Sequence, residues 1–376
     1  MSLPRIFSQP FGVLWRTALV RAPRAVPDQI LRFTTPEGPQ PFVLNLSSRG
    51  GYRIPVYVFV PASLTPEQAA SLPVVIDFHG GGFFLGSCLE QAPFCAKLAR
   101  ELSCVALTVD YRMGPVDRFP AAIEDAEDVL DAVLDSSKPA YAELRMAIAE
   151  RVLQNARDAA KAKKQPPSSA PSTVAVDLDT HRIAVSGFSS GGNLALNTAL
   201  SINPPQIGSP WPSRFPRDHP SRIPLLLYYP SFDSRLLPSE RTKPPNLLVS
   251  GSFWTDVNDV LQPTYLPRGR AHEPRASPGL ADIADGGLHD KARMLLVLPE
   301  LDTLAEQSET WVGKVLRAGR AKDLRVERFP GLKHGWTQMP ESWLGEEERR
   351  SRREIFEETV EFVRDAWAGK EMEAKA

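Results

Sequence analysis

The residues with the clearest chemical potential are a serine, an aspartate and a histidine that occur in this order, each shortly after an apolar run. The serine is Ser189 in Gly187-Phe188-Ser189-Ser190-Gly191, which fits the pattern G-x-S-x-G. This motif follows the apolar run 182–186 and opens the helical stretch 192–201, as a nucleophile elbow requires. Small residues around the serine allow the tight turn that lifts its hydroxyl to the edge of a sheet. We therefore expect Ser189 to be a nucleophile.

A serine needs a neighbouring base to become a good nucleophile. His334 follows the predicted strand 324–329 through a short turn, so it should lie at the same sheet edge as Ser189. The acid expected between them in chain order is Asp302, which follows the predicted strand 294–298. The competing residues lie in loops or at other strand ends; they are Asp233, Asp256 and Asp259 for the acid and His79, His181, His219, His272 and His289 for the base.

A second motif, His79-Gly80-Gly81-Gly82, follows the predicted strand 74–78. Consecutive glycines are costly in backbone entropy, so an unusual backbone path or a close approach must require them. A loop whose N–H groups converge on a developing oxyanion has this requirement. A phosphate cradle is the weaker alternative, because the lysine and helix start of the phosphate motifs are missing. His79 itself is expected to be a structural hydrogen-bonding residue.

Composition limits the classes of function. The chain has 376 residues, 42% of them hydrophobic, and its 44 basic and 45 acidic side chains give a net charge of -1. A chain of this composition is expected to fold. It lacks the excess of basic side chains with which proteins bind nucleic acids. Its three cysteines, Cys88, Cys95 and Cys104, show no C-x-x-C spacing, so we expect reduced, mostly buried thiols and no zinc site. No metal or organic cofactor is implied.

The remaining pattern predicts an α/β fold. Eight short apolar runs read as strands, at 42–46, 54–60, 74–78, 104–109, 182–186, 225–229, 294–298 and 324–329. Helical stretches lie between most of them, which favours a mostly parallel sheet with helices on both faces. The first two runs flank Arg49-Gly50-Gly51 and should form an antiparallel hairpin at one edge.

Two long stretches interrupt this alternation. Residues 141–164 should form an alanine-rich, charged helix, and proline-rich residues follow it at 166–171. We expect this insertion, 136–172, to be a solvated excursion without chemistry of its own. Residues 231–278 are proline-rich, and a connection of that length indicates a lid or a subdomain.

The N-terminus allows two interpretations. Arg5, Arg16, Arg21 and Arg24 precede the first acidic residue, Asp28, as in an organellar transit peptide. The scarcity of serine favours instead an amphipathic helix that docks on the body. No stretch approaches the roughly 18 apolar residues of a membrane-spanning helix. We expect a cytoplasmic protein, with organellar import as the alternative.

Together these motifs resemble the hormone-sensitive lipase family of α/β-hydrolases, in the same order from about Arg53 to Trp367. The matching stretches are His79-Gly80-Gly81-Gly82, Asp110-Tyr111-Arg112, Phe119-Pro120-Ala121-Ala122 with Asp125, Gly187 to Gly192, Ala276-Ser277-Pro278, Asp302-Thr303-Leu304 and His334-Gly335-Trp336. The resemblance implies a serine esterase with the catalytic triad Ser189, Asp302 and His334. It also implies an oxyanion hole formed by Gly81, Gly82 and Ser190.

The family builds a cap domain over the site from its N-terminal helices and from the segment before the acid strand. The implied division of this chain is an N-terminal cap segment at 1–40, a first part of the catalytic core at 41–230, a cap insertion at 231–280, a second part of the core at 281–368 and a solvated tail at 369–376.

Three departures from the family pattern concern the surroundings of the triad. Phe188 and Ser190 stand where the family usually has Asp and Ala, Gly114-Pro115-Val116 replaces Ala-Pro-Glu, and Thr303 replaces Pro. Acidic positions have thus become apolar at Phe188 and Val116, while every triad member is present. The environment of the acyl-enzyme is where this chain should differ.

The leading interpretation is a carboxylesterase- or lipase-like serine hydrolase that cleaves esters or lactones of small to medium apolar substrates. Phe83, Phe84, Phe188 and Trp336 flank the motifs and are candidates for the substrate pocket, with packing against the sheet as the equal alternative. Two other functions stay open: a biosynthetic enzyme that uses the triad for acyl transfer or cyclisation, and a non-catalytic ligand-binding receptor. The expected partner is the small-molecule substrate, without nucleic acid or an integral membrane segment, and a homodimer is left open.

Overall fold

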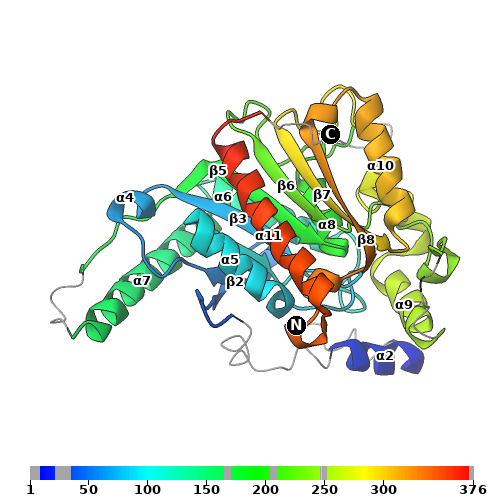
Figure 1. Cartoon of the computed structure of the whole chain (residues 1–376), viewed down its shortest axis with the longest axis horizontal. Helices are drawn as coiled ribbons and strands as arrows, with labels where there is room; N and C mark the ends of the chain where they lie inside the picture. Colours follow the sequence, from blue (N-terminus) through cyan, green and yellow to red (C-terminus); the bar gives the residue numbers. More distant parts are fainter. Residues whose placement is uncertain are drawn as a thin grey trace.

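An eight-stranded sheet forms the centre of the molecule (Figure 1). The computed structural model describes residues 9–21, 35–164, 171–203, 210–245, 247 and 252–371. The strands are β1 (Phe42–Ser47), β2 (Arg53–Phe59), β3 (Leu72–Phe78), β4 (Val105–Val109), β5 (Leu178–Phe188), β6 (Ile223–Tyr228), β7 (Ala292–Leu301) and β8 (Leu324–Lys333). Their order in the sheet is β1-β2-β4-β3-β5-β6-β7-β8.

The sheet is mostly parallel, as the sequence predicted. Only β1 with β2 and β2 with β4 pair antiparallel; every other neighbouring pair is parallel. All seven residues of β3 are buried, because helices cover both faces of the sheet at this strand. The carboxyl ends of β3, β5, β7 and β8 therefore meet at one edge, and the chemically interesting motifs follow these four ends.

Helices cover both faces of the sheet (Figure 1). On one face lie α5 (Ala92–Leu102) and α11 (Glu346–Trp367), and on the other α6 (Ala121–Leu134), α7 (Pro139–Ala162), α8 (Ser190–Thr198) and α10 (Ala305–Arg317). Side chains alternate along a strand, so Val74 and Ile76 enter one core and Val75 enters the other. The predicted fold class is confirmed.

The inserted helix α7 is not the solvated excursion that its charged composition suggested. Tyr141, Leu144, Ile148 and Val152 are buried in the main core. They recur every three or four residues, so they form one apolar stripe that packs beside β1. Only the far end of α7 projects from the body (Figure 1). The proline-rich residues 165–170 lie outside the described part of the chain.

The N-terminal helix α2 (Phe11–Arg21) packs on α9 (Ser252–Tyr265), far away in the sequence (Figure 1). Val13 and Val20 share an apolar cluster with Val257, Leu261 and Phe84. An ion pair also joins Arg16 to Asp256. The two segments assigned to a cap thus contact each other; their function as a cap stays a prediction.

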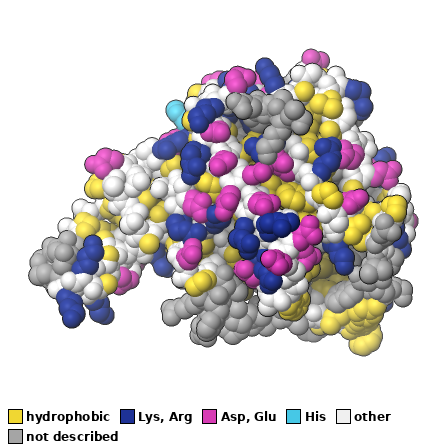
Figure 2. All heavy atoms as spheres, viewed as in Figure 1, with side chains coloured by type: hydrophobic (Ala, Val, Ile, Leu, Met, Phe, Trp, Pro, Cys, Tyr) yellow, Lys and Arg dark blue, Asp and Glu magenta, His cyan; other side chains and the backbone are white. Residues whose placement is uncertain are grey.

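The surface mixes charges of both signs. Figure 2 shows acidic and basic side chains interspersed over the face that carries α11, as expected from nearly equal numbers of the two kinds. No helix of the described residues is long and apolar enough to cross a membrane. All three cysteines lie in the described part of the chain and are buried thiols, as predicted.

One buried carboxyl group lies inside the sheet. Asp77 of β3 is fully buried beside Ser186, Thr108 and Cys95. Burial raises the pKa of Asp77 to about 7, and the opposing influence of these polar neighbours is smaller. The carboxyl is neutral in the folded protein well above the pH at which an unfolded aspartate ionises.

Asp77 should make the stability of the fold depend on pH. A raised folded-state pKa contributes stability that is complete below the unfolded value and is lost as pH rises to about 7. Asp77→Asn, which cannot ionise, should therefore stabilise the protein more at about pH 8 than at about pH 5, by about 3 kcal/mol in the free energy of unfolding. Urea unfolding at both pH values measures this difference. The exposed Asp218→Asn serves as the control, and an equal effect of the two substitutions would contradict the assignment.

Candidate active site

Ser189 occupies a strained turn between β5 and α8. Its φ is +54° and its ψ is -113°, a backbone conformation that residues other than glycine rarely adopt. The turn is held from both sides, because the Ser189 N–H donates to Tyr228 O at 2.9 Å and the Ser189 carbonyl accepts from Ser231 N at 3.0 Å. Such strain persists only where surrounding packing enforces it.

Two glycines make this turn possible. A Cβ at Gly187 would lie 2.0 Å from the carbonyl oxygen of Gly191, and a Cβ at Gly191 would lie 1.9 Å from the carbonyl oxygen of Phe78. Both distances are far below van der Waals contact, so no side chain fits at either position. The first and last residues of the G-x-S-x-G motif are thus explained by close approach of α8 to β5 and β3.

Asp302, His334 and Ser189 form a continuous hydrogen-bonded series. His334 Nε2 lies 3.0 Å from Ser189 Oγ, and His334 Nδ1 lies 2.7 Å from Asp302 Oδ2. The other carboxylate oxygen of Asp302 accepts the Leu304 N–H at 2.8 Å. The Asp302 side chain is 2% exposed and the His334 side chain 36%. A buried acid, an oriented imidazole and a hydroxyl in this order can generate a serine nucleophile.

The competing acids are engaged elsewhere. Asp233 binds Arg235, Asp256 pairs with Arg16, and Asp259 accepts the N–H of Ser239. The structure therefore places Asp302 beside the imidazole of His334, as the sequence predicted. Among the other histidines, His219 contacts the backbone carbonyls of Ser221 and of Thr180 in β5, and His289 contacts that of Pro216.

The glycine loop after β3 lies against the elbow. Gly81 and Gly82 have φ values of +118° and +61°, and a Cβ at Gly81 would lie 2.0 Å from the carbonyl oxygen of Leu85. Tyr111 ties the loop to α8, because its hydroxyl donates to His79 O at 2.8 Å and lies 3.3 Å from Ser190 Oγ. Gly81, Gly82 and Ser190 line the same cavity as Ser189.

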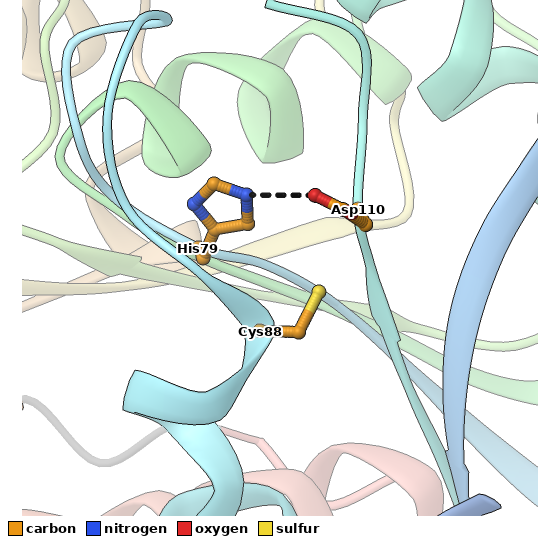
Figure 3. Close-up of side chains that lie close together, drawn as sticks. All are labelled: His79, Cys88 and Asp110. Atoms are coloured by element: carbon orange, nitrogen blue, oxygen red, sulfur yellow. Dashed lines mark ion pairs between the residues drawn. The ribbon is translucent and has the colours of Figure 1, made fainter. Parts of the chain in front are cut away.

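Three potential metal ligands meet behind this loop, as Figure 3 shows: His79, Cys88 and Asp110. Their ligand atoms lie within 4.8 Å of one another, and His79 Nε2 is 4.0 Å from Asp110 Oδ1. Ligands of a tetrahedral zinc ion would lie about 3.5 Å apart, so this spacing is too wide as it stands. The His79 ring instead stacks on Tyr111 and contacts Gly80 O at 2.6 Å. These contacts fit a structural role for His79.

A cavity of about 1500 Å³ opens above the elbow. Ser189, Asp302 and His334 line it from the core, and Leu19 and Val20 of α2 line it from the N-terminal segment. Segment 231–280 adds polar residues, which are Ser231, Ser234, Arg241, Lys243, Thr255, Asn258 and Gln262. Side chains from three distant parts of the sequence thus surround one space.

The four aromatic residues proposed for the pocket also lie on its wall, but much of their surface packs elsewhere. Phe188 stacks on Tyr228, and Trp336 packs against Tyr229 and Phe329. Phe83 stacks on Tyr265, and Phe84 joins the cluster under α2. All four are buried. Their contact with a substrate stays a prediction.

Sequence reasoning missed two kinds of residue. Tyr229 packs its ring edge-on against His334, with ring centroids 4.8 Å apart, and its hydroxyl lies 2.5 Å from Thr337 Oγ1. Arg241, Asn258 and Gln262 enter the cavity from the proline-rich segment. No motif spacing singles out the latter three, because only the folding of that segment over the sheet brings them to Ser189.

The sequence is similar to those of known hydrolases. A family model described as alpha/beta hydrolase fold matches residues 75–338. The chain is 25% identical over 302 residues to an ethyl acetate hydrolase of Pseudomonas putida, which covers 79% of this chain and 75% of that protein. It is 33% identical over 150 residues to the probable carboxylesterase 8 of Arabidopsis thaliana, covering 39% of this chain and 37% of that protein.

Among solved structures, a hyperthermophilic esterase from the archaeon Pyrobaculum calidifontis has a similar fold. The TM-score is 0.61 with 22% sequence identity, and the match covers 96% of this chain and 98% of that structure. A thermophilic carboxylesterase cloned from a metagenomic library matches with a TM-score of 0.60 over 94% of this chain and 97% of that one. At this identity the likeness concerns the fold.

The elbow geometry predicts an unequal response to two glycine substitutions. Gly191→Ala should lower the free energy of unfolding by about 3 kcal/mol, because its Cβ would collide with the backbone of β3. Gly269→Ala is the control, since a Cβ there meets nothing within 4 Å. Urea denaturation measures both variants. Equal stability of the two would contradict the close approach of α8 and β3.

Proposed function

The chain belongs to the α/β-hydrolase fold family, and from this premise we propose that it is a serine hydrolase that cleaves carboxylic esters or lactones through an acyl-serine intermediate. The resemblance to the hormone-sensitive lipase family agrees with its esterase and carboxylesterase relatives. These relatives support ester hydrolysis as a class of reaction.

The observation that carries the proposal is the unbroken series from Asp302 through His334 to Ser189, on an elbow that lines a large cavity. Each member follows the carboxyl end of a different strand. The two distances that join them, 2.7 and 3.0 Å, are those of hydrogen bonds. A series of this kind is expected to act as a catalytic triad.

In the acylation step, Ser189 Oγ attacks the ester carbonyl carbon while His334 Nε2 accepts the hydroxyl proton. The carbonyl oxygen becomes an oxyanion, which the N–H groups of Gly81, Gly82 and Ser190 would stabilise. When the C–O bond to the alcohol breaks, His334 returns the proton to the leaving oxygen. Asp302 holds the imidazole in position and stabilises its positive charge during transfer.

In the deacylation step, water replaces the alcohol. His334 accepts a proton from water, the hydroxide attacks the acyl carbon, and Ser189 leaves with the proton restored. The partial exposure of the His334 side chain supports access of water to this point. We therefore favour hydrolysis over transfer to another alcohol or amine, which product analysis with the natural substrate would distinguish.

The proposed cap consists of α2 and segment 231–280. Two observations support a joint cover over the cavity by these two segments. Val20 and Val257 belong to one apolar cluster, and Arg16 forms an ion pair with Asp256. Leu19 and Val20 reach the cavity wall, so this cover would influence the size of the substrate. The apolar residues Phe253, Trp254 and Tyr265 of segment 231–280 are further candidates for setting substrate size. Phe253 is exposed, Tyr265 is buried against Phe83, and the side chain of Trp254 lies outside the described part.

The triad should respond to substitution as one unit. Ser189→Ala should lower kcat/KM for 4-nitrophenyl butyrate by about 10⁴-fold or more while the fold survives. His334→Ala should cost a similar factor, and the double variant should lose little more than either single variant. Steady-state kinetics and circular dichroism measure activity and fold. Multiplicative losses in the double variant, or activity of several per cent in Ser189→Ala, would contradict the proposal.

Deleting residues 1–28 tests the cap separately. The deletion removes α2 and exposes Val257 and Leu261, so the ratio of activity on 4-nitrophenyl octanoate to that on the butyrate should change at least several-fold. The sheet should remain intact by circular dichroism. Deleting residues 372–376 provides the control. Unchanged kinetics after the N-terminal deletion would refute the cap and favour a transit peptide.

A further inference from the structure

Arg241 is a cation in the cavity wall without an ionic partner among the described residues. It lines the same cavity as Ser189 and His334. Its Nε is inaccessible to water and has no hydrogen-bond partner. Its Nη2 contacts a neutral group, Gln262 Oε1, at the long distance of 3.4 Å. The guanidinium thus retains most of its hydrogen-bonding capacity.

The acids around Arg241 already have other partners. Asp233, Asp259 and Asp302 are the charges that act on it most strongly. Arg235 binds both carboxylate oxygens of Asp233, and the Ser239 N–H donates to Asp259. Asp302 is held by His334 and by the Leu304 N–H. None of the three lies within ion-pair distance of Arg241.

Other arginines of the same segment show the usual arrangement. Arg235 pairs with Asp233, Arg268 with Glu240, and Arg270 with Glu273. These side chains lie at the surface, where an ion pair adds little stability. Arg241 is the more deeply placed side chain, and there an anionic partner would matter most.

Burial lowers the pKa of Arg241, against the opposing effect of the three nearby aspartates. A guanidinium nevertheless stays protonated in proteins. A partly desolvated cation without a counter-ion is unfavourable, so an anion that enters the cavity would reduce this penalty and gain charge-assisted hydrogen bonds.

The polar groups that segment 231–280 contributes to the cavity fit a carboxylate. Asn258 and Gln262 from α9 and Ser234 line the cavity with neutral polar groups. Lys243 lines it as well and is exposed. One partly buried guanidinium with neutral polar groups beside it matches a carboxylate, which its planar fork binds through two parallel hydrogen bonds.

We propose that Arg241 binds a carboxylate of the substrate, and that the preferred substrates are esters with an apolar chain that ends in a free carboxylate. This inference rests on the proposed esterase function. The carboxylate takes no part in the reaction: water still adds across the scissile C–O bond, and the acid and alcohol are released. It can belong to the acyl or to the alcohol part of the ester, and the experiment separates the two.

The test compares anionic esters with neutral esters of equal chain length. Monoethyl adipate against ethyl hexanoate places the charge on the acyl side, and 6-acetoxyhexanoate against hexyl acetate places it on the alcohol side; shorter and longer homologues cover the distance to Arg241. In one of the two pairs, the wild-type protein should have the higher kcat/KM for the anionic member. This comparison needs no variant.

Substitution of Arg241 then identifies the binding group. Arg241→Gln should lower kcat/KM for the preferred anionic ester by roughly 10- to 100-fold, mainly through KM, because charged hydrogen bonds are lost. The neutral ester should change by less than about twofold, since it does not use the guanidinium. Arg241→Lys keeps the charge and should recover part of the preference. Arg268→Gln, on the same segment, is the matched control and should leave both esters unaffected.

The outcomes separate this inference from the proposed function. Hydrolysis of neutral esters with no anionic preference in either pair overturns the role of Arg241 alone. An equal loss on anionic and neutral esters in Arg241→Gln also overturns it, because it would mean that Arg241 supports the fold or the triad. Failure to hydrolyse any ester refutes the proposed function, and this inference with it.

Discussion

The rest of the site depends on the close contact of three backbones beneath Ser189. Gly187, Gly191 and the carbonyl of Phe78 meet where β5, α8 and β3 converge, at a distance that excludes any side chain. This contact holds Ser189 in a conformation that it would otherwise avoid. The hydroxyl is fixed at the sheet edge before substrate binds, so the entropy of orienting it is lost during folding and not during the reaction. The partners of Ser189 need only follow other strands that end at the same edge of the sheet, here β7 and β8.

Parallel strands explain why so much of this site could be predicted. Residues after β3, β5, β7 and β8 share one edge, so motifs read separately in the sequence converge without long-range information. Ser189, Asp302 and His334 were placed by this argument, and their distances agree with it. Features set by packing between distant segments were not predictable in this way. The helix α7 was expected to be solvated, which was wrong, because one of its faces is buried. The contact of α2 with α9 and the position of Arg241 left no local signal in the sequence.

The cavity combines two chemical environments. Its floor contains the triad and apolar aromatic residues, whereas segment 231–280 contributes amides, hydroxyl groups and the guanidinium of Arg241. The departure from the family pattern at Phe188 is consistent with an apolar floor, because the Phe188 ring packs into the core against Tyr228 and Phe94. Chemistry would be set by the sheet edge and substrate choice by the covering segments. This separation lets the covering segments vary without disturbing the elbow.

Covalent labelling with a fluorophosphonate tests the central claim most directly, namely that Asp302 and His334 activate Ser189. The reagent reacts with an activated serine and leaves a stable adduct whose mass and position mass spectrometry can determine. The account predicts one adduct per chain, located on Ser189, and labelling at least about 100-fold slower in His334→Ala because the base is lost. An adduct on another residue, or equal labelling rates in the two proteins, would contradict it.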